Sequence, residues 1–117
     1  MSEDMIEEVY TLSYVPEGYI LEKESATSVR VKYNYKNISG ETICFEQRTK
    51  VSSDYYIDSE SGYSKIEDIV NYEIYYRNVN GMNCYISNDG KYIITFITSE
   101  KLTTEHIILM LDGITTK

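Results

Sequence analysis

The 117-residue chain lacks any run of about 18 apolar residues, and no basic start leads into a short apolar stretch. We therefore expect the sequence as given to contain neither a membrane-spanning helix nor an export signal. His106 is the only histidine, and Cys44 and Cys84 are the only cysteines. Zinc knuckles, redox pairs and local nucleophile–base motifs need closer spacing than these residues have, so the sequence predicts none of them.

Basic residues are also scarce. The chain has 11 lysines and arginines against 19 acidic residues and a net charge of −8. No stretch of sequence gathers the basic residues, so nucleic acid is not expected as a partner, nor is direct binding to anionic lipid. The first eight residues contain no basic residue and four acidic ones, Glu3, Asp4, Glu7 and Glu8. We therefore expect residues 1–8 to be an acidic linker remnant ahead of a single domain, residues 9–117.

The single proline marks a corner. Pro16 cannot donate a backbone hydrogen bond, and Gly18 permits the positive φ of a tight turn. Apolar residues resume at Tyr19 and Leu21. The Pro16–Gly18 corner is thus expected to join two extended pieces and to direct the second into a sheet.

Alternating apolar and polar residues dominate the remaining sequence. Residues 29–36 alternate strictly, and Asn37–Gly40 supplies a turn into a second strand over 41–50. Another hairpin pairs residues 82–87 with 91–98 through the Asn88–Gly90 turn. Weaker strands are expected at 9–12, 19–24, 65–70 and 72–77. Because residues 92–97 are apolar on both faces, we expect their strand to be central or covered on both sides.

One helix is expected, near the end of the chain. Thr103 or Thr104 can cap it, and Glu105 suits its positively polarised start. An apolar stripe follows: Ile107, Met110, Leu111 and Ile114. Ile108 and Leu109 fall outside the stripe, which indicates either deep packing, the interpretation we favour, or an exposed patch for a partner. The fold class predicted is α+β: a single antiparallel sheet of about five to seven strands with a C-terminal helix packed on one face.

Candidate chemical groups are sparse. Carboxylates gather between residues 54 and 68, at Asp54, Asp58, Glu60, Glu67 and Asp68, but they lack the alternating pattern of a calcium loop. A solvated loop is the simpler interpretation. His106 is expected to face solvent on the helix. No catalytic residue, metal site or cofactor is predicted, and we expect the protein not to be an enzyme.

Tyrosine is abundant, with 13 residues against two phenylalanines. Tyrosine favours half-buried strand positions, which is the interpretation we prefer to an aromatic binding surface. Each cysteine is interpreted as a small apolar filler in a strand, and a disulfide between Cys44 and Cys84 stays open if the domain is extracytoplasmic. The residues expected to contact a partner are exposed tyrosines, two acids and the two extra helix residues: Tyr55, Tyr56, Asp58, Glu60, Tyr72, Tyr75, Ile108 and Leu109.

Several landmarks follow one another in a recognisable order. They are Tyr14-Val15-Pro16-Glu17-Gly18-Tyr19, Tyr35-Lys36-Asn37, Gly40 to Gln47, Asp58-Ser59-Glu60, Asp89-Gly90-Lys91-Tyr92, and the stretch from Leu102 to Ile107. This succession resembles the bacterial domain-of-unknown-function family numbered 4367. The corner and the terminal helix are also similar to the C-terminal domain of MucB/RseB-type sigma-factor regulators. Members of the family often carry a tryptophan in the strand before the Asp-Gly turn, where this chain has Cys84 to Ser87.

The resemblance implies a location more than an activity. Such domains stand on the extracytoplasmic face of the cell membrane of Gram-positive bacteria, in membrane-anchored proteins similar to anti-sigma factors. The chain is accordingly expected to be an ectodomain whose membrane contact runs only through an anchor absent from this sequence. Its expected function is that of a non-catalytic sensor or interaction domain, monomeric or weakly dimeric, that binds a protein or envelope component. Two alternatives stay open: an accessory to an envelope glycan or peptidoglycan hydrolase that uses the acidic loop, and a structural dimerisation module.

Overall fold

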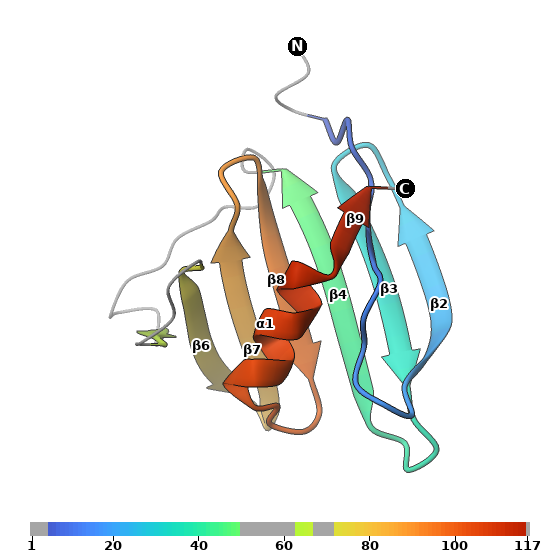
Figure 1. Ribbon diagram of the computed structural model, residues 1–117, viewed down its shortest axis with the longest axis vertical. Helices are drawn as coiled ribbons and strands as arrows, with labels where there is room; N and C mark the ends of the chain where they lie inside the picture. Colours follow the sequence, from blue (N-terminus) through green and yellow to red (C-terminus); the bar gives the residue numbers. More distant parts are fainter. Residues whose placement is uncertain (1–4, 50–62, 67–71, 117) are drawn as a thin grey trace.

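The computed structural model describes residues 5–49, 63–66 and 72–116 (Figure 1). Its main feature is a seven-stranded antiparallel sheet with the strand order β2-β3-β4-β8-β7-β6-β5. The strands are β2 Ile20–Ala26, β3 Arg30–Lys36, β4 Thr42–Thr49, β5 Ser64–Lys65, β6 Ile74–Val79, β7 Met82–Asn88 and β8 Tyr92–Thr98. Helix α1, Thr104–Asp112, lies across one face of the sheet. This arrangement confirms the predicted α+β class.

The strand over residues 92–98 is central, as its apolar faces predicted. β8 pairs with β4 on one side, where Phe45 faces Phe96, and with β7 on the other, where Tyr85 faces Phe96. On the sheet face beneath α1, Ile94 and Phe96 are buried, and on the opposite face Ile93 is buried as well. We call that opposite side the reverse face. β8 is therefore shielded on both faces.

The helix follows its predicted signals at its start. Thr103 is the N-cap, and its hydroxyl accepts a hydrogen bond from the backbone N–H of His106 at 3.2 Å. Ile107, Met110 and Leu111 are buried against the sheet. Glu105 lies in the first turn, as predicted.

The end of the helix differs from the prediction. The apolar stripe was expected to continue to Ile114, but the helix ends at Asp112 and Gly113 caps it. Ile114 instead begins β9, Ile114–Thr116, which pairs antiparallel with β1, Tyr10–Leu12, in a separate two-stranded sheet. The spacing of Ile114 fits either a helix or a strand, and in the structure Ile114 pairs with Leu12 of β1.

The prediction that Ile108 and Leu109 both pack deeply is correct only for Ile108. Ile108 is half-buried and packs against the core, whereas Leu109 is 41% exposed. Of these two residues, Ile108 therefore contributes to the core and Leu109 lies on the exposed side of the helix.

The predicted corners and turns are present. Gly18 adopts φ 92°, and the backbone N–H of Tyr19 donates to the carbonyl of Pro16 at 3.2 Å. The turn between β3 and β4 closes by a hydrogen bond from Gly40 N–H to Asn37 O at 3.0 Å. Among the described residues, no helix is long and apolar enough to cross a membrane.

The segment before β1 is also held to the sheet. The N–H of Ile6 donates to the carbonyl of Ser28 at 2.6 Å, and Lys91 forms an ion pair with Glu8 at 2.7 Å. The hydroxyl of Tyr92 accepts the N–H groups of Glu7 and Glu8 at 3.1 and 3.3 Å. Residues 6–8, which belong to the expected acidic linker remnant, thus contact the folded domain.

Candidate functional site

Three tyrosine hydroxyls connect distant segments through carboxylates. Tyr10 donates to Asp89 at 2.6 Å, Tyr19 donates to Glu100 at 2.6 Å, and Tyr72 donates to Asp112. Burial and the neighbouring carboxylates raise the pKa of Tyr10 and Tyr19 far above the ordinary value, because an ionised phenol would be desolvated and repelled. These hydroxyls stay protonated and act as structural donors.

Further tyrosines bind backbone groups. Tyr33 donates to the carbonyl of Tyr10 at 2.9 Å. The hydroxyl of Tyr85 donates to Leu102 O at 3.2 Å and accepts Leu102 N–H at 3.1 Å. The abundance of tyrosine therefore serves the packing of loops and strands onto the sheet, in agreement with the preferred interpretation of its composition.

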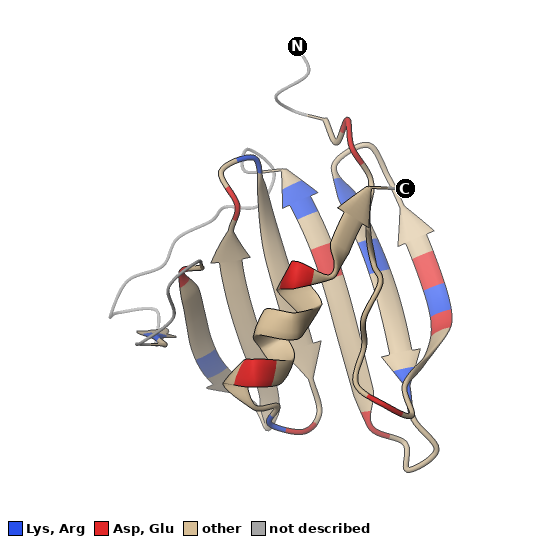
Figure 2. Cartoon of the chain, in the orientation of Figure 1, with Lys and Arg blue, Asp and Glu red and all other residues tan. Residues whose placement is uncertain are grey.

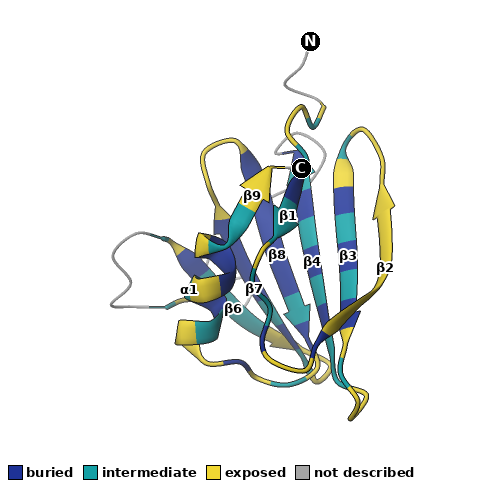
Figure 3. Ribbon diagram, turned by 45° about the vertical axis from the view of Figure 1, so that its right-hand side comes forward, coloured by how far each residue is buried: buried dark blue, intermediate teal, exposed yellow. Residues whose placement is uncertain are grey.

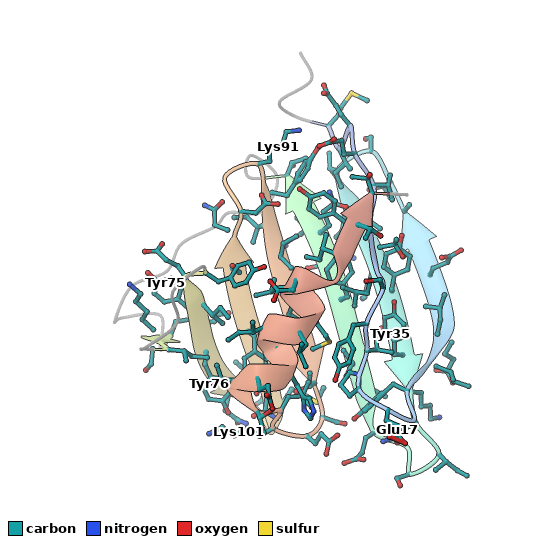
Figure 4. All side chains as sticks on the ribbon, viewed as in Figure 1. Glu17, Tyr35, Tyr75, Tyr76, Lys91 and Lys101 are labelled. Carbon is teal, nitrogen blue, oxygen red and sulfur yellow. The ribbon has the colours of Figure 1, made fainter. Side chains whose placement is uncertain are left out.

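The predicted partner-contact residues do not form one surface in the described part of the chain. Tyr72 is half-buried beside the end of α1, and Tyr75 lies in β6, where it faces Ile86 across the strands on the reverse face. Tyr76, the next residue, lies on the face beneath α1, where Lys101 approaches its ring at 5.1 Å (Figure 4). Ile108 and Leu109 lie on the helix. Tyr55, Tyr56, Asp58 and Glu60 fall outside the described residues, as do Asp54, Glu67 and Asp68.

The two cysteines lie on the same face but on different strands. Cys44 in β4 and Cys84 in β7 both face Ile97 of the strand between them. Two strand spacings separate their Cα atoms by about 10 Å, beyond the reach of about 7 Å that a disulfide needs. Both thiols are free, and burial raises the pKa of each. The disulfide that the sequence left open is therefore excluded within this fold.

Metal-binding geometry is absent from the described residues. Within ranges 5–49, 63–66 and 72–116, no group of three or more histidine, cysteine or carboxylate side chains could hold a metal ion. His106 is half-buried in the first turn of α1 rather than fully solvent-facing.

The strongest candidate surface lies at the free edge of the sheet. Ile20, Leu21 and Ile38 are 72%, 49% and 103% exposed. They border one hollow of about 540 Å³, which we call the edge hollow; its lining residues are Gly18, Ile20, Leu21, Glu22, Lys36, Asn37 and Ile38. Clustered exposed apolar residues mark sites where a partner binds, whereas isolated ones are ordinary on a protein surface.

Strand β2 forms the edge beside this hollow. All seven of its residues are exposed (Figure 3). β2 pairs with β3 on one side, and no described strand pairs with its other side. A β-bulge between Leu21 and Lys23 interrupts the pairing close to the hollow. An edge strand of this kind presents unpaired backbone N–H and C=O groups to a partner.

A second hollow borders the other end of β2. Its volume is about 240 Å³, and its lining residues are Val9, Glu24, Ser25, Ala26, Val31 and Tyr33. Val31 and Tyr33 are buried on the face beneath α1, so this hollow opens over the edge of the core. One exposed strand thus runs between two hollows.

Basic residues gather on the reverse face next to this edge. Arg30 faces Arg48 across β3 and β4, Lys32 faces Glu46, and Lys23 of β2 faces Asn34. We call Lys23, Arg30, Lys32, Lys36 and Arg48 the basic face. Figure 2 shows the basic bands on three neighbouring strands. The alternation of residues 29–36 already places Arg30, Lys32 and Lys36 on one face of β3. Only the antiparallel register brings Lys23 of β2 and Arg48 of β4 beside them.

Ion pairs occupy part of the basic face. Arg30 and Arg48 each approach a carboxylate oxygen of Glu46 at 3.3 Å, and Lys36 approaches Glu22 at 4.0 Å. Within the part of the chain that the structure describes, Lys23 and Lys32 have no acidic partner within 4.0 Å. Positive charge therefore remains available along the middle of β2 and β3.

Three features therefore lie together at this edge of the sheet. They are exposed apolar side chains, an edge strand that no described strand covers, and positive charge on the reverse face. Features of these kinds occur at surfaces where macromolecules bind. Sequence reasoning assigned Leu21 to a strand and Ile38 to a turn without predicting their exposure. An isoleucine within a polar turn was the one available signal.

Residues 9–114 match the family described as Domain of unknown function (DUF4367), and the chain belongs to that family. No curated protein matches the chain. No solved structure matches it either.

Proposed function

We propose that this member of the DUF4367 family is a non-catalytic sensor or interaction domain on the extracytoplasmic face of a membrane-anchored, anti-sigma-like bacterial protein. The observation that carries the binding role is the edge hollow, where Ile20, Leu21 and Ile38 are exposed together beside an unpaired strand edge. Exposure of three large apolar side chains is costly in water, so a surface of this kind is usually retained for a partner.

The proposed location rests on the family resemblance, including the similarity to MucB/RseB-type regulators. An ectodomain that reports on the cell envelope needs a surface for an envelope component, and the free edge of the sheet supplies one. The partner is proposed to be a protein or another envelope component, and membrane contact would run through an anchor outside this sequence.

Location is tested with the native full-length protein in intact cells. External protease should remove the signal of an antibody to this domain without lysis, and the signal should fractionate with the membrane. Protection until lysis, together with recovery in the soluble fraction, would contradict the proposed location.

The binding role is tested by site-specific photocrosslinking in living cells. A photoreactive amino acid at Ile38 should capture a defined envelope component. The same group at Val79, which is 37% exposed on the β6–β7 side of the sheet, is the matched control and should capture far less. Equal yields from both positions, or no product from either, would argue against a binding role for the edge hollow.

A further inference from the structure

The shape of the free edge is appropriate for an extended peptide. β2 has seven exposed residues, which at about 3.3 Å per residue corresponds to roughly 23 Å of edge. An incoming strand can pair with the outward backbone groups of such an edge and extend the sheet by one strand. Backbone pairing supplies affinity in this mode of recognition, and pockets for alternate side chains supply specificity.

The two hollows provide such pockets. The edge hollow surrounds the start of β2 at Ile20 and Leu21, and the second hollow flanks its end at Ser25 and Ala26. A strand that lies along β2 would therefore meet a hollow near each of its ends. The first is bordered by Ile20, Leu21 and Ile38, so it would accept an aliphatic or aromatic side chain.

The positive charge of Lys23 and Lys32 favours an acidic side chain in the middle of the incoming strand. Lys23 is exposed at the centre of β2, and Lys32 lies on the neighbouring strand of the same face, opposite Ser25. A side chain of the added strand that projects on the reverse face beside Lys23 would lie next to this positive charge. An aspartate or glutamate there would be attracted, and a lysine or arginine would be repelled.

We propose that the β2 edge binds an extended segment of another protein by strand addition, with an apolar side chain in the edge hollow and an acidic side chain beside Lys23. This inference rests on the proposed function and names the binding mode and the chemistry of its partner.

A second copy of the chain fits this edge poorly. A two-fold axis through the middle of β2 would place Lys23 opposite Lys23 of the second copy, and Glu22 opposite Glu24. Like charges directly across an antiparallel pair are destabilising. A polyanion fits poorly for a different reason, since it could be attracted to the basic face but would leave Ile20, Leu21 and Ile38 exposed.

The probe for this inference is a displayed library of nine-residue random peptides, selected against the intact chain. Selection should enrich peptides with an acidic residue near the centre and an apolar residue toward one end. The variant Lys23→Glu should reverse the preference at the central position from acidic to basic residues. A peptide selected on the wild-type chain should bind the Lys23→Glu variant about tenfold more weakly, and the reverse should hold for a peptide selected on the variant, because attraction is replaced by repulsion.

Two further measurements identify strand addition and the hollow. N-methylation of a selected peptide at successive residues should weaken binding at every second position, because only alternate N–H groups of an added strand point toward β2. Ile38→Ser should lower affinity, and it should fold normally because Ile38 is fully exposed. Leu109→Ser, at an exposed position on the helix, is the matched control and should leave binding unchanged.

The inference is overturned if the library yields no enriched peptide, or if the selected peptides bind the Lys23→Glu variant as well as they bind the wild type. It is also overturned if N-methylation weakens binding equally at every position of the peptide. The inference would also be overturned if Leu109→Ser weakened peptide binding and Ile38→Ser did not. Concentration-dependent dimerisation of the chain that Lys23→Glu abolishes would overturn it as well. None of these results depends on the cellular crosslink from Ile38. If that crosslink forms while the peptide experiments fail, the interaction function stands and only strand addition is lost.

Discussion

Gln47 holds the N-terminal strand onto the sheet through both ends of its side-chain amide. Its Oε1 accepts the N–H of Tyr10 at 3.0 Å, and its Nε2 donates to the carbonyl of Glu8 at 2.9 Å. Gln47 is 0% exposed in β4, and its bond to Tyr10 is buried, so water cannot replace that bond, whereas the bond to the exposed Glu8 is part-buried. A buried polar residue is thus matched to two backbone groups 37 and 39 residues away.

Gln47→Leu should destabilise the protein strongly. The substitution leaves the buried N–H of Tyr10 without its partner, which costs about 1–3 kcal/mol, whereas water can reach the carbonyl of the exposed Glu8. The free energy of unfolding, measured by urea denaturation, should fall by about 1–3 kcal/mol. Asn34→Leu, at a half-buried position of β3 on the reverse face, is the control and should change stability by about 0.5 kcal/mol or less. Equal effects of the two substitutions would show that the amide of Gln47 has no special role.

The corner at Pro16 depends on the conformation of Gly18. Gly18 has φ 92°, and a Cβ atom added there would meet nothing within 4 Å. Gly18→Ala should therefore lower the free energy of unfolding by about 1–2 kcal/mol through backbone strain alone. Replacement by D-alanine in semisynthetic protein should avoid this loss, because D-residues favour positive φ. If L- and D-alanine were equally destabilising, side-chain packing rather than φ would be the cause.

The local turns and strands were predictable because their signals are short-range. Gly18 marked the corner, and the strict alternation of residues 29–36 located β3. The sheet order was not predictable, because a period of two identifies a buried face but not the neighbouring strand. For that reason the gathering of Lys23 and Lys32 beside one edge, and the edge position of β2, became visible only in the folded chain.

The C-terminal strand shows a second limit of prediction from hydrophobic periodicity. Ile114 falls at helical spacing from Ile107, so periodicity alone extended the helix too far. Gly113 was the contrary signal, because glycine favours helix ends. Leu109 illustrates the same ambiguity for burial: its hydrophobicity favoured the core, while the position on the helix left it exposed.

Alkaline pH should destabilise the protein through its tyrosines. Burial, and then the hydrogen bond to Asp112, raise the pKa of Tyr72 from 10.0 to about 12. Between these values the folded protein keeps a proton that the unfolded chain loses, so the stabilising contribution of Tyr72 is complete below pH 10 and declines as pH rises toward 12. Burial also raises the pKa of Tyr63 to about 12, with the same sign.

The measurement is urea denaturation from pH 8 to 12 together with the absorbance of ionised phenol. The free energy of unfolding of the wild-type chain should decrease above about pH 10. Tyr72→Phe should show a shallower decrease, and it should be less stable at pH 8 by about 0.5–1.5 kcal/mol because the hydrogen bond is absent. If the variant and the wild type had parallel pH profiles, Tyr72 would not contribute to the alkaline loss.

The positions of Cys44 and Cys84 predict how the thiols respond to oxidants. Because Ile97 lies between them in the register, the folded chain cannot join them without moving two strands. Treatment of the native protein with a thiol oxidant should produce no intrachain crosslink on non-reducing electrophoresis, and both thiols should still react with a maleimide after denaturation. Burial raises the pKa of both thiols, so alkylation in the native state should be slow compared with the denatured chain. The same oxidation performed in denaturant is the control, because the flexible chain can then bring the two sulfur atoms together. An intrachain crosslink that forms equally fast under native conditions would contradict the strand order β4-β8-β7, since that order is what keeps the two cysteines apart.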